Sequence, residues 1–187
     1  MVEKKENELT RTFICIEFQD EVIKEIARVQ EVLENKKFHG KITELENLHL
    51  TLKFLGEINN ATLEKVKEKL KKIELNAFEA HLGEIGTFSF RGNPRIVWCK
   101  VCGKEVWDLQ SAVDGCLAEI FQKEQRFMSH LTIARIKYPK DKKRFAEYVR
   151  RIKCKKIKFK VEKFFLKKSE LKPNGPIYTT IEEYNLK

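Results

Sequence analysis

The chain has 187 residues, 42% of them hydrophobic, which is enough for one sizeable core and excludes an intrinsically disordered chain. Its apolar runs, such as Phe164-Phe-Leu166, are too short to cross a membrane as a helix. Lys and Arg outnumber Asp and Glu by 38 to 28, and the resulting charge of +10 favours a polyanionic partner such as nucleic acid, although a charged surface kept for solubility explains it equally well.

Predicted strands and helices alternate along the first half of the chain. In order we expect a strand, a helix, a strand, a helix and a longer β-rich stretch, at residues 12–18, 21–34, 48–54, 61–73 and 78–90. Apolar residues at three- and four-residue spacing indicate the helices, and β-branched or alternating apolar residues indicate the strands. Asp20 is placed to cap the first helix, Gly56 to end the second strand, and Gly83 and Gly86 to interrupt the last stretch.

The second half of the chain repeats this order. We expect a strand, a helix, a strand, a helix and a strand, then a turn and a final strand, at 96–101, 104–122, 130–134, 141–152, 157–161, 171–176 and 178–184. Lys156, Lys158 and Lys160 alternate with apolar residues and give the fifth element a basic face. That face could bind an RNA backbone. It is equally typical of a solvated edge strand whose lysines prevent pairing with another chain.

Cysteine usage and the start of the chain bear on compartment and metal binding. Residues 1–11 are polar and lack the apolar core of a secretion signal, so we expect a cytoplasmic protein whose five cysteines are reduced. Cys99 and Cys102 form a C-x-x-C pair, but residues three apart on a strand point to opposite faces. Because no second pair completes a zinc site, we expect core cysteines, no metal and no cofactor.

One short pattern occurs at equivalent places in the two halves, as His49-Leu-Thr-Leu52 and His130-Leu-Thr-Ile133. Residues two apart on a strand share a face, so each histidine points the same way as its threonine, Thr51 or Thr132, while the apolar residues point into a core. A single such histidine is usually a packed core residue. Two copies in a duplicated arrangement indicate a functional site, since packing does not require His and Thr between the apolar positions.

The duplication also predicts the architecture. We expect an α+β fold of two pseudo-symmetric lobes, each an antiparallel sheet with helices packed on its outer face, and an active-site cleft between the sheets. The two lobes would form one intertwined domain, 1–187, from repeat units of roughly 11–90 and 94–168 and a C-terminal strand, 177–185. We expect this domain to be a monomer that does not bind a membrane.

Two histidines and two threonines in one cleft suit phosphoryl chemistry without a metal ion. The ordinary pKa of histidine is ~6.5, so one ring can take a proton from a nucleophile while the other gives one to a leaving oxygen. Each threonine hydroxyl can donate to a phosphoryl oxygen. The residues alone do not decide which histidine is the acid and which the base.

The paired motifs resemble those of the two-histidine (2H) phosphoesterase superfamily, and most closely the bacterial and archaeal RNA 2′,3′-cyclic phosphodiesterases, or 2′-5′ RNA ligase-like proteins. The segments that carry the resemblance are Arg11-Thr-Phe13, Asn47 to Gly56, Pro94 to Trp98, Arg126 to Arg135 and Ser169 to Tyr178. One departure is Ser129, where the family often has proline before the second histidine.

The resemblance implies hydrolysis of RNA 2′,3′-cyclic phosphate ends to a 2′-phosphate, with tRNA fragments as one candidate substrate. By analogy it makes His130 the general base and His49 the general acid, with Arg135 joining Thr51 and Thr132 in binding the phosphate. Further candidates for RNA contact are Arg11, Phe54 and Arg126. Two alternatives stay open: 2′-5′ ligation of RNA halves at the same site, and a non-catalytic RNA-binding protein, which the net charge favours.

Overall fold

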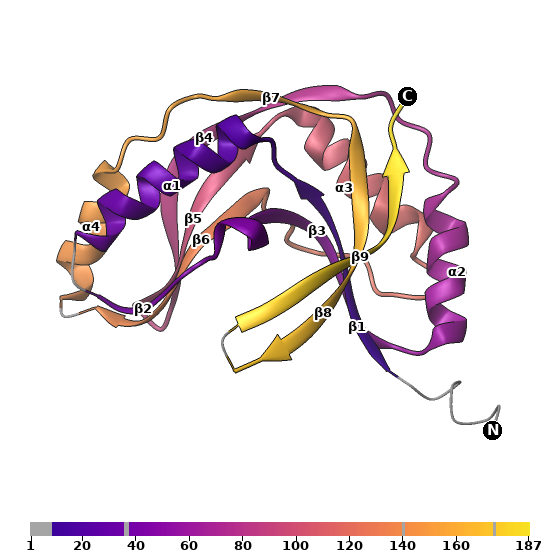
Figure 1. The fold of residues 1–187 in the computed structure, drawn as a ribbon, viewed down its shortest axis with the longest axis horizontal. Coiled ribbons are helices and arrows are strands. Elements are labelled where there is room, and N and C mark those ends of the chain that lie inside the picture. Colours follow the sequence, from indigo (N-terminus) through magenta and orange to yellow (C-terminus); the bar gives the residue numbers. More distant parts are fainter. Residues whose placement is uncertain (1–8, 36–37, 140, 174) are drawn as a thin grey trace.

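A computed structural model describes residues 9–35, 38–139, 141–173 and 175–187, and its fold is one curved antiparallel sheet with four α-helices on its outer face (Figure 1). The elements are β1 (Thr10–Glu17), α1 (Asp20–Glu34), β2 (Phe38–Ile42), the 3-10 turn η1 (Leu45–Asn47), β3 (His49–Ile58), α2 (Asn60–Leu70), β4 (Phe78–Phe90), β5 (Asn93–Cys102), α3 (Lys104–Cys116), β6 (His130–Pro139), α4 (Lys142–Arg151), β7 (Lys158–Val161), β8 (Lys163–Lys172) and β9 (Gly175–Asn185). The predicted α+β class is confirmed.

The sheet consists of two halves that meet at its centre. Its strand order is β7-β4-β5-β6-β3-β1-β8-β9, with β2 paired to β6, and β3 meets β6 at the single pair Leu50↔Leu131. Helices α1 and α4 lie over the half that contains β6, and α2 and α3 lie over the half that contains β3 (Figure 1). The two sheets predicted from the sequence are therefore two halves of one sheet, which this residue pair joins.

The two halves of the sequence exchange elements. β4, from the first half, pairs with β5 and β7, while β8, from the second half, pairs with β1 and β9. The helices cross over as well, since α1 contacts β6 and α3 contacts β3. Each lobe is thus built from both halves of the chain, which ties the lobes together around the β3–β6 contact.

The apolar core lies between the sheet and the helices. All four helices bury residues in it, among them Val22, Val66, Val106 and Phe145. β3 and β6 have the same length and the same order of buried and exposed positions along ten residues. This match is the clearest structural trace of the repeat seen in the sequence.

Several predicted boundaries were wrong. Asp20 is the first residue of α1, and the cap position is Gln19, whose carbonyl accepts the first helical N–H bonds. α2 ends at Leu70, short of the predicted residue 73. α3 ends at Cys116, not at residue 122, because the apolar residues that follow it pack in a turn closed by the Phe121 N–H to the Leu117 carbonyl.

The predicted strand ends also moved. β3 does not stop at Gly56, because this glycine adopts a φ of +74° at a bulge and the strand continues to Ile58. β4 is continuous from Phe78 to Phe90 despite its two glycines, and a Cβ on Gly86 would overlap the Trp98 indole. The turn predicted at 171–176 is shorter, since β8 runs to Lys172 and β9 starts at Gly175.

Candidate active site

The two H-x-T motifs lie side by side at the centre of the sheet. Leu50 and Leu131 each follow one of the motif histidines, and they face each other across the antiparallel β3–β6 contact. Continuing this pairing by one residue sets His49 opposite Thr132 and His130 opposite Thr51. Diagonal neighbours in an antiparallel pair are about 7–8 Å apart, which is the separation expected between the two histidine backbones.

All four motif side chains lie on the face of the sheet away from the helices. Leu50, Leu52, Leu131 and Ile133 are buried in the core under the helices, so the residues between them point to the opposite face. The histidines and threonines are half-buried there. The histidines therefore share one concave surface.

Two β-bulges bring a further side chain from each strand to this surface. Trp98 pairs with Thr132 but Val97 pairs with Ala134, so Ile133 is an extra residue in β6. The bulge reverses the alternation, and Arg135 faces the same side as His130 although it lies five residues further on. The same shift in β3 brings Phe54, which is paired with Phe13, to the surface of His49.

Both imidazoles are held by a backbone carbonyl two residues earlier in the chain. His49 Nδ1 lies 2.8 Å from the Asn47 carbonyl oxygen, and His130 Nδ1 lies 2.7 Å from that of Met128. A carbonyl only accepts, so Nδ1 carries the hydrogen in both rings and the neutral ring presents its lone pair at Nε2. His49 Nε2 accepts from the Thr51 hydroxyl at 3.0 Å.

The electrostatics of the site favour neutral histidines near pH 7. The pKa of His49 is lowered to about 4, chiefly by burial and also by the charges of Lys167 and Arg135, while the Asn47 carbonyl acts in the opposite direction. Burial also lowers the pKa of His130, again with a contribution from Arg135. The Arg135 guanidinium thus acts on both histidine rings. Its charge is therefore placed to attract an anion that contacts both rings.

Aromatic side chains enclose each histidine. The Phe13 ring lies 4.9 Å and the Tyr178 ring 5.2 Å from the ring of His49, centre to centre. The Phe88 ring lies 4.9 Å from that of His130, edge to face. None of these three residues is a site residue predicted from the sequence, although Phe13 and Tyr178 lie in the segments that carry the family resemblance.

Buried polar side chains from two helices support the strands that carry the motifs. From α1, the Gln30 amide donates to the carbonyls of Thr43, at 2.8 Å, and of the bulge residue Ile133, at 3.2 Å. From α3, Asp114 forms a buried ion pair with Lys53 of β3 and accepts from the Glu124 N–H. These contacts fix the backbone on either side of the site.

The remaining sequence candidates lie at different distances from this centre. Arg11 is exposed on β1, and its charge acts on Tyr178, so it stands at the edge of the site. Arg126 lies in the connection between α3 and β6, where its backbone N–H donates to Glu124. Ser129 is buried and its hydroxyl donates to the Val101 carbonyl, which anchors the residue before His130.

The described part of the chain gives no sign of a metal centre or of a membrane span. No group of three or more His, Cys, Asp or Glu side chains in it is arranged to hold a metal ion. None of its helices has the length and apolar character that crossing a bilayer requires.

Comparison with known proteins gives consistent matches. A family model described as LigT-like phosphoesterase matches residues 16–98 and 102–178. A protein of Methanocaldococcus jannaschii named RNA 2′,3′-cyclic phosphodiesterase is 34% identical over 177 residues, which are 93% of this chain and 99% of that relative. A relative with the same name from Thermotoga maritima is 31% identical, over 92% of this chain and 94% of its own length.

Solved structures share the fold. The crystal structure of TT0787 of Thermus thermophilus matches with a TM-score of 0.81 and 27% identity, over 94% of this chain and 97% of that protein. The structure of Escherichia coli LigT in complex with 3′-AMP matches with a TM-score of 0.77 and 21% identity, over 96% of this chain and 99% of that protein. At that lower identity the second match concerns the fold alone.

Proposed function

The chain belongs to the LigT-like phosphoesterase family of two-histidine phosphoesterases, and on this premise we propose that it hydrolyses RNA 2′,3′-cyclic phosphate ends to 2′-phosphates without a metal ion. The observation that carries the proposal is the pair of H-x-T motifs on adjacent strands, with Arg135 acting on both histidines. Because the two histidines come from different halves of the sequence, the proposal treats 1–187 as one catalytic domain.

The proposed reaction is a displacement at phosphorus. Nε2 of His130 takes a proton from water, the water oxygen bonds to phosphorus, and the bond from phosphorus to the 3′ oxygen breaks. His49 gives its Nε2 proton to that oxygen, which leaves a 2′-phosphate and a 3′-hydroxyl. The low pKa of His49 opposes this acid role in the free protein. A bound cyclic phosphate carries a negative charge that raises the pKa of the ring, so His49 would gain its proton with the substrate.

The other surface residues have separate parts in the proposal. Arg135 and the hydroxyls of Thr51 and Thr132 donate to the non-bridging phosphate oxygens as charge builds on them. Phe54 occupies the position in β3 that Arg135 occupies in β6, and its side chain is 69% exposed. An exposed ring beside a phosphate site suits stacking against a base of single-stranded RNA.

The activity can be tested with a short RNA that ends in a 2′,3′-cyclic phosphate, in excess EDTA. We expect full turnover and a product carrying a 2′-phosphate and a 3′-hydroxyl. Activity that needs added Mg²⁺ or Mn²⁺, or a 3′-phosphate product, would contradict the proposal. Adding a 5′-hydroxyl RNA at high concentration tests the reverse reaction, and a 2′-5′ linkage formed faster than hydrolysis would favour the ligase alternative.

Replacing Arg135 by glutamine is expected to change both substrate affinity and the pH profile. Hydrogen bonds to charged groups contribute about 1.5–3 kcal/mol, so kcat/KM should fall roughly tenfold to a hundredfold. The Arg135 charge lowers the pKa of both histidines, so its loss raises both values. The acidic limb of the kcat/KM profile, which reports the free enzyme, should therefore move to higher pH.

Arg95 offers a matched control for this experiment. It is an exposed arginine on the neighbouring strand β5, and its guanidinium donates to the Lys137 carbonyl at 2.7 Å. Arg95→Gln removes the same charge from the same lobe and should leave the acidic limb in place. An unchanged profile in Arg135→Gln, or an equal shift in both variants, would refute the role of Arg135.

A further inference from the structure

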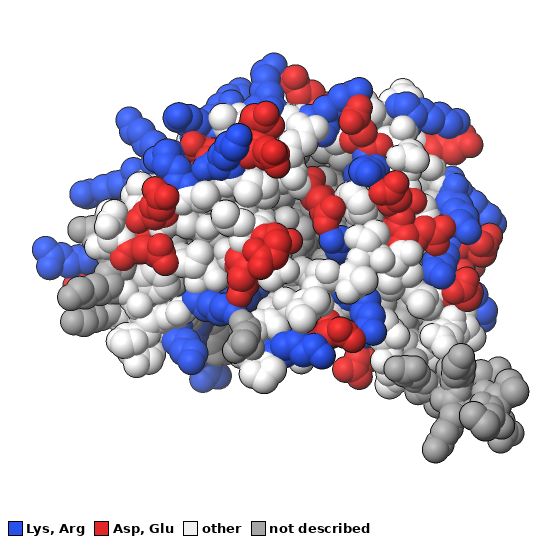
Figure 2. Space-filling model, viewed as in Figure 1, with Lys and Arg blue, Asp and Glu red and all other residues white. Residues whose placement is uncertain are grey.

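One short segment carries most of the net charge of the protein. Residues 141–160 contain ten Lys and Arg against two acidic residues, Asp141 and Glu147, which gives +8 of the chain's +10. The segment covers α4, the connection 152–157 and the strand β7. Figure 2 shows Lys and Arg side chains along the upper left outline of the molecule, where Figure 1 places this segment.

The segment passes around the edge of the sheet. α4 packs on the outer face through Phe145 and Val149. Among the described strands β7 pairs with β4 alone, so it is an edge strand. Phe159 and Val161 of β7 are buried in the core. Lys158 and Lys160 therefore lie on the opposite face, which is the face of the histidines. The basic residues thus lead from the outer side of the sheet to the surface of the candidate site.

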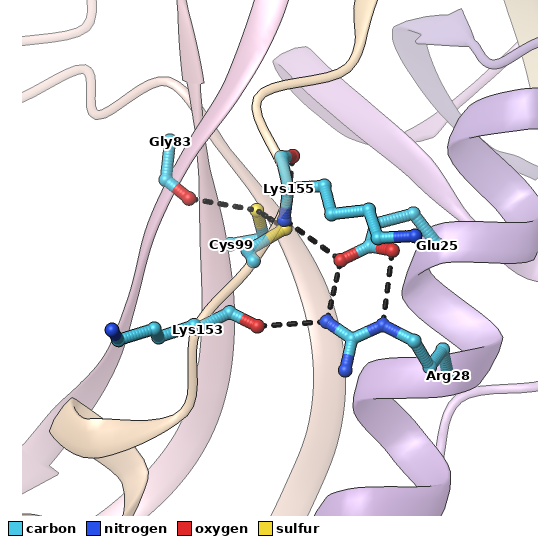
Figure 3. A network of polar contacts seen from close by, with 7 residues as sticks. Glu25, Arg28, Gly83, Cys99, Lys153 and Lys155 are labelled. Carbon is cyan, nitrogen blue, oxygen red and sulfur yellow. Dashed lines mark hydrogen bonds and ion pairs between the residues drawn. The ribbon is translucent and has the colours of Figure 1, made fainter.

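The connection between α4 and β7 is held in place by α1 (Figure 3). The Arg28 guanidinium donates to the Lys153 carbonyl at 2.7 Å, and the Lys155 N–H donates to Glu25 at 2.8 Å. Between these two lysines, Cys154 lies with its Sγ 3.8 Å from that of buried Cys99. Because these contacts fix the backbone, the exposed lysines on either side of Cys154 have defined positions.

Most of these charges are not neutralised within the protein. We call the following set the basic arc: Arg150, Arg151, Lys153, Lys155 and Lys156. In the described ranges no ion pair joins any residue of the basic arc to an acidic side chain. Lys158 and Lys160, which continue it toward the site, pair with Glu79 and Glu162.

The equivalent helix of the other lobe carries less unpaired charge than the basic arc. α2 holds the place in the first half of the chain that α4 holds in the second. Five lysines lie in and just after it, and three of them are paired: Lys67 with Glu64, Lys69 with Glu119 and Lys71 with Glu68. In the described ranges the other two, Lys65 and Lys72, join no ion pair. All five residues of the basic arc lie outside these ion pairs, against two lysines in the α2 region, so the unpaired charge is concentrated in one lobe. A lysine surface kept only for solubility does not explain that imbalance.

We propose that the basic arc binds the sugar–phosphate backbone of single-stranded RNA whose end occupies the histidine site. This inference rests on the proposed function, because it takes the substrate to be RNA. The arc has no large exposed apolar side chain that could enter a bilayer, which favours RNA over an anionic membrane. Backbone phosphates, unlike bases, attract cationic side chains without regard to sequence.

The geometry sets the RNA length at which the arc begins to act. Three strand spacings separate β6 from the edge strand β7, or about 14 Å at ~4.8 Å each. A helically stacked strand has one phosphate per ~3.4 Å along its axis, so a stacked RNA needs roughly four nucleotides to reach the edge. The basic arc should therefore have no effect on the turnover of short substrates, whereas the binding of longer RNA should depend on it.

The test compares Lys153→Ala/Lys156→Ala with the wild type in two measurements. The first is binding of a twelve-nucleotide single-stranded RNA with a 3′-hydroxyl, followed by fluorescence anisotropy between 50 and 200 mM salt. We expect Kd to rise roughly threefold to tenfold and the slope of log Kd against log salt to fall by about 1.4, at ~0.7 for each phosphate contact. The second is turnover of a dinucleotide 2′,3′-cyclic phosphate, whose kcat/KM should not change.

Lys65→Ala/Lys72→Ala is the matched control, because both lysines are exposed in and after α2 and the change in charge is the same. Equal RNA binding by the wild type and the arc variant would overturn the inference, as would an equal loss in the control. Loss of binding to phosphatidylserine vesicles with RNA binding intact would overturn it in favour of a membrane. Lack of dinucleotide turnover by the wild type would instead count against the proposed function, and the binding measurement would still test the arc.

Discussion

Replacing His49 or His130 by alanine is expected to lower kcat on a 2′,3′-cyclic phosphate by about 10²–10⁴, the usual contribution of a general acid or base. Each ring is oriented by a carbonyl at Nδ1 and presents Nε2 to the same concave surface. The double variant should be only slightly worse than either single one, because residues that act in one proton transfer chain are not additive. Steady-state rates on the same RNA measure both effects.

His39→Ala is the control for these variants, since His39 lies on β2 against Tyr138 and outside the motifs. It should keep full activity. Either motif variant keeping more than a tenth of wild-type kcat, with its fold intact by circular dichroism, would contradict two-histidine catalysis.

The same variants can decide which histidine is the acid. An aryl phosphodiester with a nitrophenolate leaving group needs no proton on its leaving oxygen, so loss of the general acid should matter much less with that substrate than loss of the general base. We expect His49→Ala to regain much of its lost activity with the aryl substrate, and His130→Ala to stay as inactive as with RNA. The opposite result would exchange the two roles and leave the site itself unaffected.

The orientation of the motif side chains could be predicted from the sequence, but that of the other side chains on the same surface could not. Alternation on a strand correctly places His130 and Thr132 together, because no irregularity lies between them. Continued alternation would turn Arg135 to the opposite face. The bulge at Ile133 reverses this, and neither glycine nor proline marks it in the sequence. Arg135 was therefore a candidate from family resemblance alone, and its orientation required the structure.

The exchange of elements between the two halves was also beyond local patterns. The stretch 78–90 was recognised as β-rich, but its pairing with β5 and β7 depends on contacts with residues far away in the sequence. β8 was missed as a strand because its second half, from Lys167 to Lys172, is mostly polar and lacks an alternating apolar pattern. Its pairing with β1 and β9 compensates for that weak local preference.

Breaking the Lys53–Asp114 ion pair is expected to cause the largest loss of stability of any single polar substitution in the site's support. The two side chains are only 5% and 8% exposed, so Lys53→Ala leaves a buried carboxylate without its cation. Removing one partner of a buried pair costs about 3–5 kcal/mol. The free energy of unfolding from urea titration should fall by that amount for Lys53→Ala and for Asp114→Ala.

A control variant and a double variant distinguish the effect expected of a buried ion pair from that of a surface ion pair. Lys163→Ala acts on the exposed pair with Glu183 and should cost at most about 1 kcal/mol. Lys53→Met/Asp114→Leu should recover much of the loss, because no charge then stays unpaired in the core. If the double variant loses as much free energy of unfolding as the two single variants added together, the two residues act independently. That result would contradict a coupled pair.

The stability of this pair should also depend on pH in one direction. Although burial acts to raise the pKa of Asp114, the Lys53 ammonium and the Glu124 N–H lower it below its ordinary value, so folding favours the ionised carboxylate. The unfolded chain binds the proton more readily than the folded one, and stability is therefore lost as pH falls below about 4. In Asp114→Asn this part of the acid sensitivity should disappear. Urea titration of the wild type and of Asp114→Asn between pH 7 and pH 3 measures this difference.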